Sequence, residues 1–235
     1  MSTDQPSGER PSPRERRRAA KSAEILDVAW ELAQRDGITA ISLRELADRV
    51  DLRQPSLYSY FESKADLYDA MFAQGFQELV DERERLQLDP DPNIALRQGC
   101  RHFIEFCVAN PARYQLLFQH SIPGFTPSES SMDISRRALA FLERWMVAAG
   151  IEDPSGLDLM RAMLLGVSGE QLANEPGGRR WIRFTDDLVD VVVEVLRRKK
   201  TGASKRPNDS KSREAASERD NRRRAPREPE RHRSR

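Results

Sequence analysis

An all-α fold is predicted for this chain by two observations. Apolar residues recur three and four positions apart over most of the sequence, which is the spacing of one helix face. Helix start signals, such as Ser63 followed by Asp66 or Asp153 followed by Pro154, alternate with Pro and Gly stops. The sequence therefore predicts a succession of amphipathic helices separated by short breaks.

The first predicted helix runs from about Pro13 or Arg17 to Arg35 and ends at Gly37, a residue that readily stops helices. Before it, residues 1–12 are rich in Ser, Pro, Gly and charge, and we expect them to be disordered. Basic residues crowd the start of the helix as an arm; these are Arg14, Arg16, Arg17, Arg18 and Lys21. This arm is either a solvated charge run or a contact with a polyanion.

The second predicted helix begins at Ser42. Ser42 and Glu45 have the spacing of a capping box, in which each side chain bonds the backbone amide of the other residue. Leu43, Leu46 and Val50 follow at helical spacing on one face. This helix therefore covers an apolar surface and exposes its charged side.

A break of about three residues, Asp51 to Arg53, leads to a shorter predicted helix over 54–60, and this is the length of a helix-turn-helix joint. Asp51 needs a turn conformation that Asp tolerates, and Pro55 suits a first helical turn. Leu57 and Phe61 can anchor the helix inward. Hydroxyl and amide groups face outward from Gln54, Ser56, Tyr58, Ser59 and Tyr60. Such groups suit DNA base edges and phosphate oxygens.

A fourth helix is predicted from the Ser63 cap to about Leu86, and Asp89-Pro90-Asp91-Pro92 follows as its stop signal. Lys64 in its first turn opposes the helix dipole, and a nearby phosphate would resolve that conflict. The helix starts beside the candidate DNA contacts and ends well away from them. It is therefore the natural mechanical link between two domains.

These motifs together resemble the N-terminal DNA-binding signature of the tetracycline-repressor (TetR/AcrR) family of transcriptional regulators. The resemblance is carried by Ile38-Thr39, Ser42 to Ala47, Leu57-Tyr58, Tyr60-Phe61, Ser63-Lys64 and Leu67. Asp51 and Pro55 depart from the commonest pattern, which often has glycine and a small residue there. The resemblance implies a dimer that presents two recognition helices to a pseudo-palindromic operator, with half-sites about 34–36 Å apart or a multiple of it.

The predicted DNA-binding head covers residues 13–68. Beside a helix-turn-helix, we interpret the basic arm as a phosphate or minor-groove contact. Gln54, Ser56 and Tyr60 are expected to face bases, whereas Tyr58, Lys64 and the helix start at Ser42 hold phosphates. The complete predicted set is Arg17, Arg18, Ser42, Leu43, Arg44, Arg53, Gln54, Pro55, Ser56, Tyr58, Ser59, Tyr60 and Lys64.

A helical body for ligand binding and dimerisation is predicted over residues 69–198. Its later helices are expected over 93–108, 111–118, 128 or 130–149, 154–174 and 186–198, the last capped by Thr185. The run from Asn110 to Phe125 resembles, weakly, the C-terminal domain of one TetR subgroup. The last helix is apolar nearly all round and needs cover on more than one side, from its own chain or from a second subunit. The family resemblance implies that the last two helices build a four-helix dimer interface.

An effector pocket is predicted among the middle helices, although ordinary core packing explains each of its residues individually. The candidate lining is Phe72, Phe76, Phe103, Cys107, Tyr114, Phe118, Phe125, Trp145 and Met163. An unidentified small molecule, apolar or planar, could bind there, tilt the helix that begins at Ser63 and release DNA by binding the non-binding conformation better. Cys100 and Cys107 are interpreted as thiols at or near the core, with redox pairing between subunits as the alternative.

The net charge of +1 conceals an asymmetry. From Arg197 to the end, sixteen Lys or Arg stand against six Asp or Glu, while the remainder holds 23 against 32. We expect the tail, residues 199–235, to be disordered and solvated. The alternative is that it binds DNA weakly and without sequence preference. No run of about 18 apolar residues and no secretory segment is present, so a cytoplasmic protein without a membrane span is expected.

Catalytic chemistry is not indicated. The sequence contains no phosphate-binding glycine loop, zinc-like Cys/His spacing or Gly-x-Ser-x-Gly elbow, so neither an enzyme, a cofactor nor a metal is predicted. We expect a ligand-responsive repressor that binds its operator as a homodimer. The alternative is a helical protein-interaction module that binds nucleic acid non-specifically through its basic tail, and substitution of Gln54 and Tyr60 would separate the two.

Overall fold

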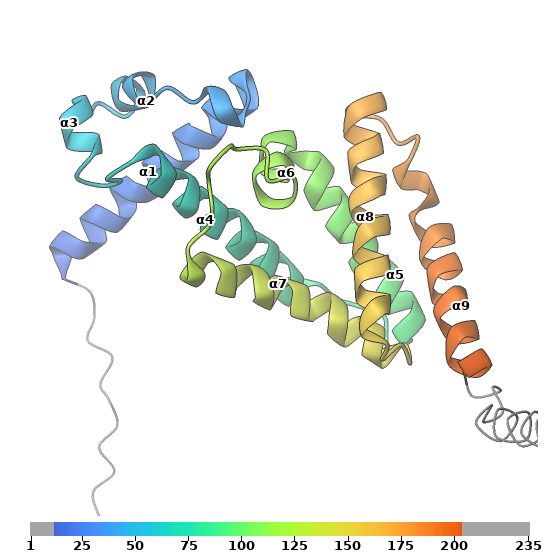
Figure 1. The fold of residues 1–235 in the computed structure, drawn as a ribbon. Helices are drawn as coiled ribbons and strands as arrows, with labels where there is room; N and C mark the ends of the chain where they lie inside the picture. Colours follow the sequence, from blue (N-terminus) through green and yellow to red (C-terminus); the bar gives the residue numbers. More distant parts are fainter. Residues whose placement is uncertain (1–11, 204–235) are drawn as a thin grey trace, which may run out of the picture. The chain divides into compact units, whose positions relative to one another are not determined.

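Helices account for all the regular secondary structure of residues 12–203, the part of the chain that our computed structural model describes (Figure 1). The chain divides into two units, Met1–Val193 and Glu194–Arg235. The first unit contains the head, the body and the start of the last helix. The all-α prediction is confirmed.

The head begins with a long helix followed by short ones: α1 (Pro13–Asp36), the 3₁₀ helix η1 (Ile38–Ala40), α2 (Leu43–Arg49) and α3 (Gln54–Leu57). The long α4 (Lys64–Arg85) leads into the body. The remaining elements are α5 (Pro92–Ala109), α6 (Pro111–Phe118), α7 (Glu129–Ala148), α8 (Pro154–Asn174), the 3₁₀ helix η2 (Ile182–Phe184) and α9 (Thr185–Ala203).

Helix starts follow the local signals of the sequence. The Ser63 hydroxyl accepts a hydrogen bond from the Asp66 amide at 3.1 Å, and the Asp153 carboxylate accepts one from the Ser155 amide at 3.0 Å. Asn110 caps α6 in the same way. Side-chain capping satisfies amides that have no partner within a helix, which is why these starts are readable from sequence.

One predicted capping box is incomplete in the structure, and one complete box was not predicted. Ser42 caps α2, but Glu45 does not complete the box, because its carboxylate accepts a hydrogen bond from Arg35 at 2.7 Å. A complete capping box occurs instead at Ser12 and Glu15, so α1 has an ordered start within the segment predicted to be disordered. The rest of that segment, residues 1–11, lies outside the described residues.

The last helix also differs in its bounds. The Thr185 hydroxyl does not cap α9 but donates to the Ile182 carbonyl oxygen at 2.6 Å, because the 3₁₀ helix η2 leads directly into it. The helix continues to Ala203, so the first residues of the predicted tail are helical. Residues 204–235, the rest of the tail, lie outside the described part.

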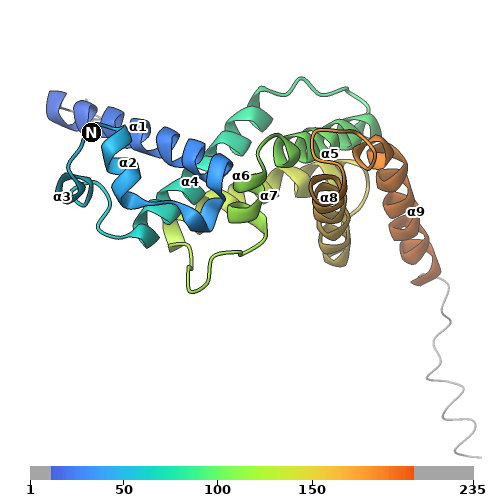
Figure 2. The same cartoon turned by 90° about the horizontal axis from the view of Figure 1, so that it is seen from above.

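α4 joins the head to the body, and it runs beside α7 in both views (Figures 1 and 2). On the head side, the buried Tyr68 hydroxyl donates to the Ile38 carbonyl oxygen at 2.9 Å. On the body side, the Asp69 carboxylate accepts hydrogen bonds from the Ser128 amide at 2.7 Å and the Ser131 hydroxyl at 2.9 Å. Adjacent residues of one helix therefore hold the head and the start of α7.

The body core forms around α5. Cys100 and Cys107 are both fully buried free thiols, and desolvation raises the pKa of each to about 12. They are therefore neutral core residues at neutral pH, which confirms their predicted placement. Gly99 lies directly under the Trp145 ring of α7, where a larger residue would overlap the indole.

Within residues 185–193, α9 has one buried and one exposed apolar side. Val189 is buried, whereas Val191 is 55% exposed. Arg97 of α5 makes a two-pronged ion pair with Asp190, at 2.8 and 3.0 Å, and thereby holds this part of the helix against the body. The predicted apolar circumference is thus only partly covered by the chain itself.

Candidate DNA-binding surface and internal cavity

The turn between α2 and α3 has the backbone that its sequence requires. Asp51 adopts a left-handed conformation with φ of 53°, which Asp accommodates better than most residues. Leu46 of α2 and Leu57 of α3 are buried, with exposed fractions of 0% and 1%. The two short helices therefore pack through one apolar contact layer and leave their other sides exposed.

Two basic residues of α1 contact the backbone at the ends of these two short helices. Arg18 donates to the Ser59 carbonyl oxygen at 2.7 Å, and its guanidinium lies 5.4 Å from the centre of the Tyr60 ring. Lys21 donates to the Val50 carbonyl oxygen at 2.7 Å. These contacts stabilise the ends of α2 and of the α3 segment, so Arg18, which we predicted to contact DNA, also has a structural partner.

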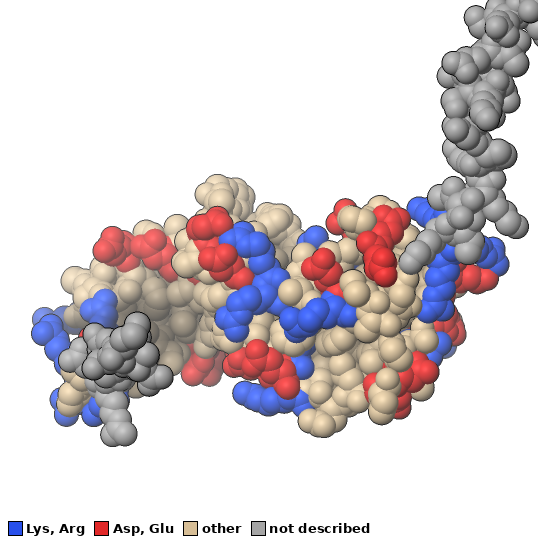
Figure 3. Space-filling model, turned by 90° about the horizontal axis from the view of Figure 1, so that it is seen from below, with Lys and Arg blue, Asp and Glu red and all other residues tan. Residues whose placement is uncertain are grey.

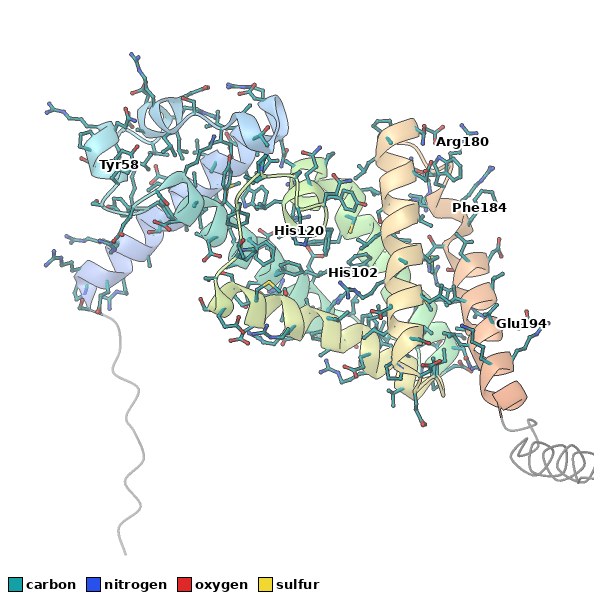
Figure 4. All side chains as sticks on the ribbon, in the orientation of Figure 1. Tyr58, His102, His120, Arg180, Phe184 and Glu194 are labelled. Atoms are coloured by element: carbon teal, nitrogen blue, oxygen red, sulfur yellow. The ribbon has the colours of Figure 1, made fainter. Side chains whose placement is uncertain are left out.

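The outward face of α3 is polar and largely exposed. Arg53, Gln54, Pro55 and Ser56 are exposed, and the Tyr58 side chain, 41% exposed, extends from the end of the helix (Figure 4). Regular α-helix ends at Leu57, before the predicted Tyr60, and a turn follows. Tyr60 is half-buried beneath Arg18, and the Ser59 hydroxyl donates to the Ser56 carbonyl oxygen at 2.7 Å.

Arginines near this surface divide into paired and unpaired groups. Arg35 and Arg49 make ion pairs with Glu45 and Glu31, which link α1 to α2. Arg17, Arg44 and Arg53 are exposed, and none of them has an ion-pair partner within residues 12–203. Figure 3 shows basic side chains on the head, at the left of the view. Unpaired cations around an exposed polar helix are what phosphate binding requires.

Lys64 has a partner that the sequence did not reveal. Its amino group donates to the Thr39 carbonyl oxygen at 3.1 Å and lies 5.5 Å from the centre of the Tyr68 ring. A carbonyl oxygen and a ring face thus offset part of the conflict with the helix dipole. Because an ammonium group has three donors, Lys64 retains capacity for a phosphate.

A cavity of about 290 Å³ lies among α4, α5, α6, α7 and α8. Four of the predicted pocket residues line it: Phe72, Phe76, Phe103 and Phe118. Their rings pack edge to face or tilted, for example Phe76 and Phe118 at 5.4 Å. This volume is close to the lower end of small-molecule sites, about 300 Å³.

The other five predicted residues do not line this cavity, because each has another place in the packing. Tyr114 donates to the Leu165 carbonyl oxygen at 2.9 Å, and Phe125 packs against Tyr68 in the loop before α7. Cys107 lies in the core, Trp145 lies on Gly99 of α5, and Met163 is half-buried on α8. Aromatic content alone did not distinguish core from cavity.

Sequence reasoning missed Arg83, the buried cation of the cavity wall. It is 6% exposed, donates to the Ala138 carbonyl oxygen of α7, and lies 5.4 and 5.5 Å from the ring centres of Phe103 and Trp145. Desolvation lowers its pKa to about 10. It stands in a run of alternating charges that reads as a solvent-facing helix end, so no local signal marked it.

The remaining polar side chains of the cavity wall are three basic residues and one serine. Arg136, Arg161, His120 and Ser135 border the cavity, and no Asp or Glu among the described residues does. Figure 4 places His120 between α6 and α7. Arg136 is already neutralised by ion pairs with Glu129, at 2.6 Å, and with Asp133. Arg83 therefore differs from Arg136 in having no acidic partner on the described chain.

Other kinds of site find no support within residues 12–203. These residues contain no cluster of His, Cys, Asp or Glu that could hold a metal ion. None of their helices is sufficiently long and apolar to cross a membrane.

A helix-turn-helix head with an exposed polar second helix and unpaired arginines, joined to a helical body, defines a DNA-binding transcriptional regulator. Residues 25–71 match the family described as bacterial regulatory proteins of the tetR family, and residues 96–199 match the tetracyclin repressor-like C-terminal domain. The chain belongs to the TetR family of transcriptional regulators, and it is not an enzyme.

Named relatives and a solved structure agree with this placement. The transcriptional activator FasR of Mycolicibacterium smegmatis is 27% identical over 171 residues, 72% of this chain and 74% of FasR. The transcriptional repressor KstR2 of Rhodococcus jostii is 25% identical over 59% of this chain and 69% of KstR2. The fold is similar to that of a TetR variant from Acinetobacter baumannii in complex with minocycline, with a TM-score of 0.53, 20% identity and coverage of 75% of this chain and 96% of that chain.

Proposed function

We propose that the protein is a ligand-responsive repressor that binds a pseudo-palindromic operator as a homodimer and is released by a small molecule. The observation that carries this proposal is the course of α4. The helix begins at Lys64, shortly after α3 ends at Leu57 in the chain, and then lines the cavity with Phe72, Phe76, Leu79 and Arg83. Occupation of the cavity therefore acts on the same helix that positions the head.

The DNA contacts follow from exposure and pairing. Gln54 and Ser56 on α3 face base edges, and Tyr60 contributes only its accessible edge because Arg18 covers its ring. Arg44, Arg53, Tyr58 and Lys64 hold phosphates from both sides of that helix. The basic arm at the start of α1 extends the phosphate contact.

The dimer uses the exposed apolar side of α8, of the end of η2 and of the start of α9. Leu159, Phe184 and Val191 are 38%, 40% and 55% exposed. On α8, Gly166 is also exposed and has no neighbour within 4 Å of the position a Cβ would take. Small residues beside apolar ones allow helices to approach closely, and a second copy of the same surface would remove this area from water.

Binding of a small molecule is supported by the TetR variant in complex with minocycline, whose fold is similar to that of this chain. Repression is supported by the name of KstR2, while FasR is named as an activator. The sign of regulation thus differs between these two relatives. In our proposal, DNA binding blocks transcription and the ligand favours a conformation that does not bind DNA.

The test is a gel-shift or anisotropy titration against the DNA flanking the coding region, at two salt concentrations with excess non-specific competitor. Two protomers on a competitor-resistant site support the proposal. If binding disappears with competitor on flanking DNA and also yields no enriched site in a genome-wide selection, the sequence-specific function is wrong. The paired substitutions Gln54→Ala and Tyr60→Ala must abolish the specific complex, since a tail-bound non-specific module would be unaffected.

A further inference from the structure

We infer that the effector is a small organic acid whose carboxylate pairs with Arg83 and whose apolar part lies along α4 toward Phe72. This inference rests on the proposed ligand-release function and specifies the chemistry of the ligand. It depends on the burial, the missing partner and the position of Arg83.

The burial of Arg83 needs compensation that the chain supplies only in part. The residue is only 6% exposed, and a buried guanidinium is costly unless a counter-charge and hydrogen bonds accompany it. Ala138 accepts one hydrogen bond, and two ring faces lie nearby, but the Nε donor has no partner within the described residues.

No internal anion neutralises Arg83 in the described chain. It has no ion pair with Asp or Glu among residues 12–203, and the neighbouring thiols of Cys100 and Cys107 are protonated at neutral pH because burial raises their pKa. An incoming carboxylate would supply both the charge and an acceptor for Nε. Neutral ligands would leave the charge of Arg83 without a counter-ion.

The cavity also specifies the shape of the ligand. Phe72, Phe76, Leu79 and Arg83 follow one another along α4, over roughly 16 Å at 1.5 Å per residue. Phe72 and Phe76 therefore line one end of the α4 wall, and Arg83, with the Phe103 ring beside it, lies at the other. A single carboxylate on an aromatic or aliphatic body fits this polarity, and the volume of about 290 Å³ restricts that body to a small molecule.

The test compares acids with their uncharged amides. Octanoate, phenylbutyrate and naphthylacetate, each beside its primary amide, are titrated into the full-length protein by calorimetry in the absence of DNA. We expect the acids to bind at least about tenfold more tightly than the amides, because the charged guanidinium then pairs with an anion and not with a neutral acceptor. Arg83→Met should abolish that preference, and Arg83→Lys should retain part of it.

Arg136→Gln is the matched control, because it also removes one cation from the cavity wall but one that Glu129 and Asp133 already neutralise. It should leave the acid preference unchanged. Equal binding of acids and amides, no binding by any acid, or an undiminished preference in folded Arg83→Met would overturn the inference. Acids that bind through Arg83 but do not displace DNA would instead refute the release step of the proposed function.

Discussion

The burial of Arg83 predicts an effect on the stability of the protein as well as on ligand binding. Because the buried guanidinium is charged at every pH below about 10, its desolvation destabilises the folded protein throughout that range. The destabilisation decreases only as the pH rises from about 10 toward the ordinary pKa of arginine. We expect Arg83→Met, measured without ligand, to stabilise the protein by about 1 kcal/mol and to raise Tm by about 2–4 °C, since the lost ring contacts offset part of the gain.

A useful comparison is Arg113→Met. Arg113 pairs with Glu78 and lies 3.8 Å from the centre of the Phe106 ring, so its removal breaks a partly buried pair. This substitution should destabilise the protein by about 1–3 kcal/mol in the same thermal unfolding experiment. If Arg83→Met destabilises the protein as much as Arg113→Met, then Arg83 is a structural residue rather than one held for a ligand.

A second prediction for a single residue concerns phosphate binding by Lys64. If it holds a phosphate, Lys64→Met should weaken binding to operator and random DNA by the same factor and reduce the salt slope by about 1. Titrations at several salt concentrations measure both effects. Lys64→Arg should restore the slope, because it keeps the charge. An unchanged slope in Lys64→Met would assign the residue wholly to its contact with the Thr39 carbonyl oxygen.

At the scale of elements, the contact between α5 and α7 depends on the absence of a side chain at Gly99. A methyl group there would overlap the Trp145 ring, which packs against the helix from α7. We expect Gly99→Ala to destabilise the protein by about 1–3 kcal/mol in denaturant unfolding, because overpacking forces the helices apart. Trp145→Leu should rescue Gly99→Ala in the double variant. Additive losses instead would mean that the two positions do not share this contact.

The helices themselves were predictable because their signals are local. Ser63, Asn110 and Asp153 cap helices through bonds that span only two or three residues, and proline or glycine terminates the preceding elements. Prediction failed where a distant residue competes. Glu45 has the spacing of a capping box, yet Arg35 on another helix takes its carboxylate. Local rules do not include such partners.

The candidate sites show the same limit. Exposure of the α3 face was predictable, because polar residues there alternate with the predicted anchors Leu57, which is buried, and Phe61, which is half-buried. The cavity was only partly predictable, since Phe103 lines it while Trp145, equally apolar and aromatic, fills a groove over a glycine. Arg83 was invisible, because its burial depends on α7 covering a helix face whose sequence is charged.

The last prediction concerns the whole molecule, because the proposed function requires a second copy of the chain. Val191 and Val147 are both exposed valines on helices, at 55% and 50%, but only Val191 lies on the proposed dimer surface. Because twofold symmetry repeats each substitution on both subunits, Val191→Glu would place two like charges in an apolar interface. We expect it to weaken dimerisation by about 100-fold, or ~3 kcal/mol, whereas Val147→Glu should leave dimerisation unchanged.

Analytical ultracentrifugation of the two variants and the parent protein measures this difference, and operator titration gives its consequence. A single head reads one half-site, so the loss of the dimer should remove the gain that comes from binding two linked half-sites together. Monomeric Val191→Glu should therefore bind the operator only weakly while keeping its thermal unfolding cooperative. A Val191→Glu protein that remains dimeric, or a Val147→Glu protein that does not, would place the interface on another surface.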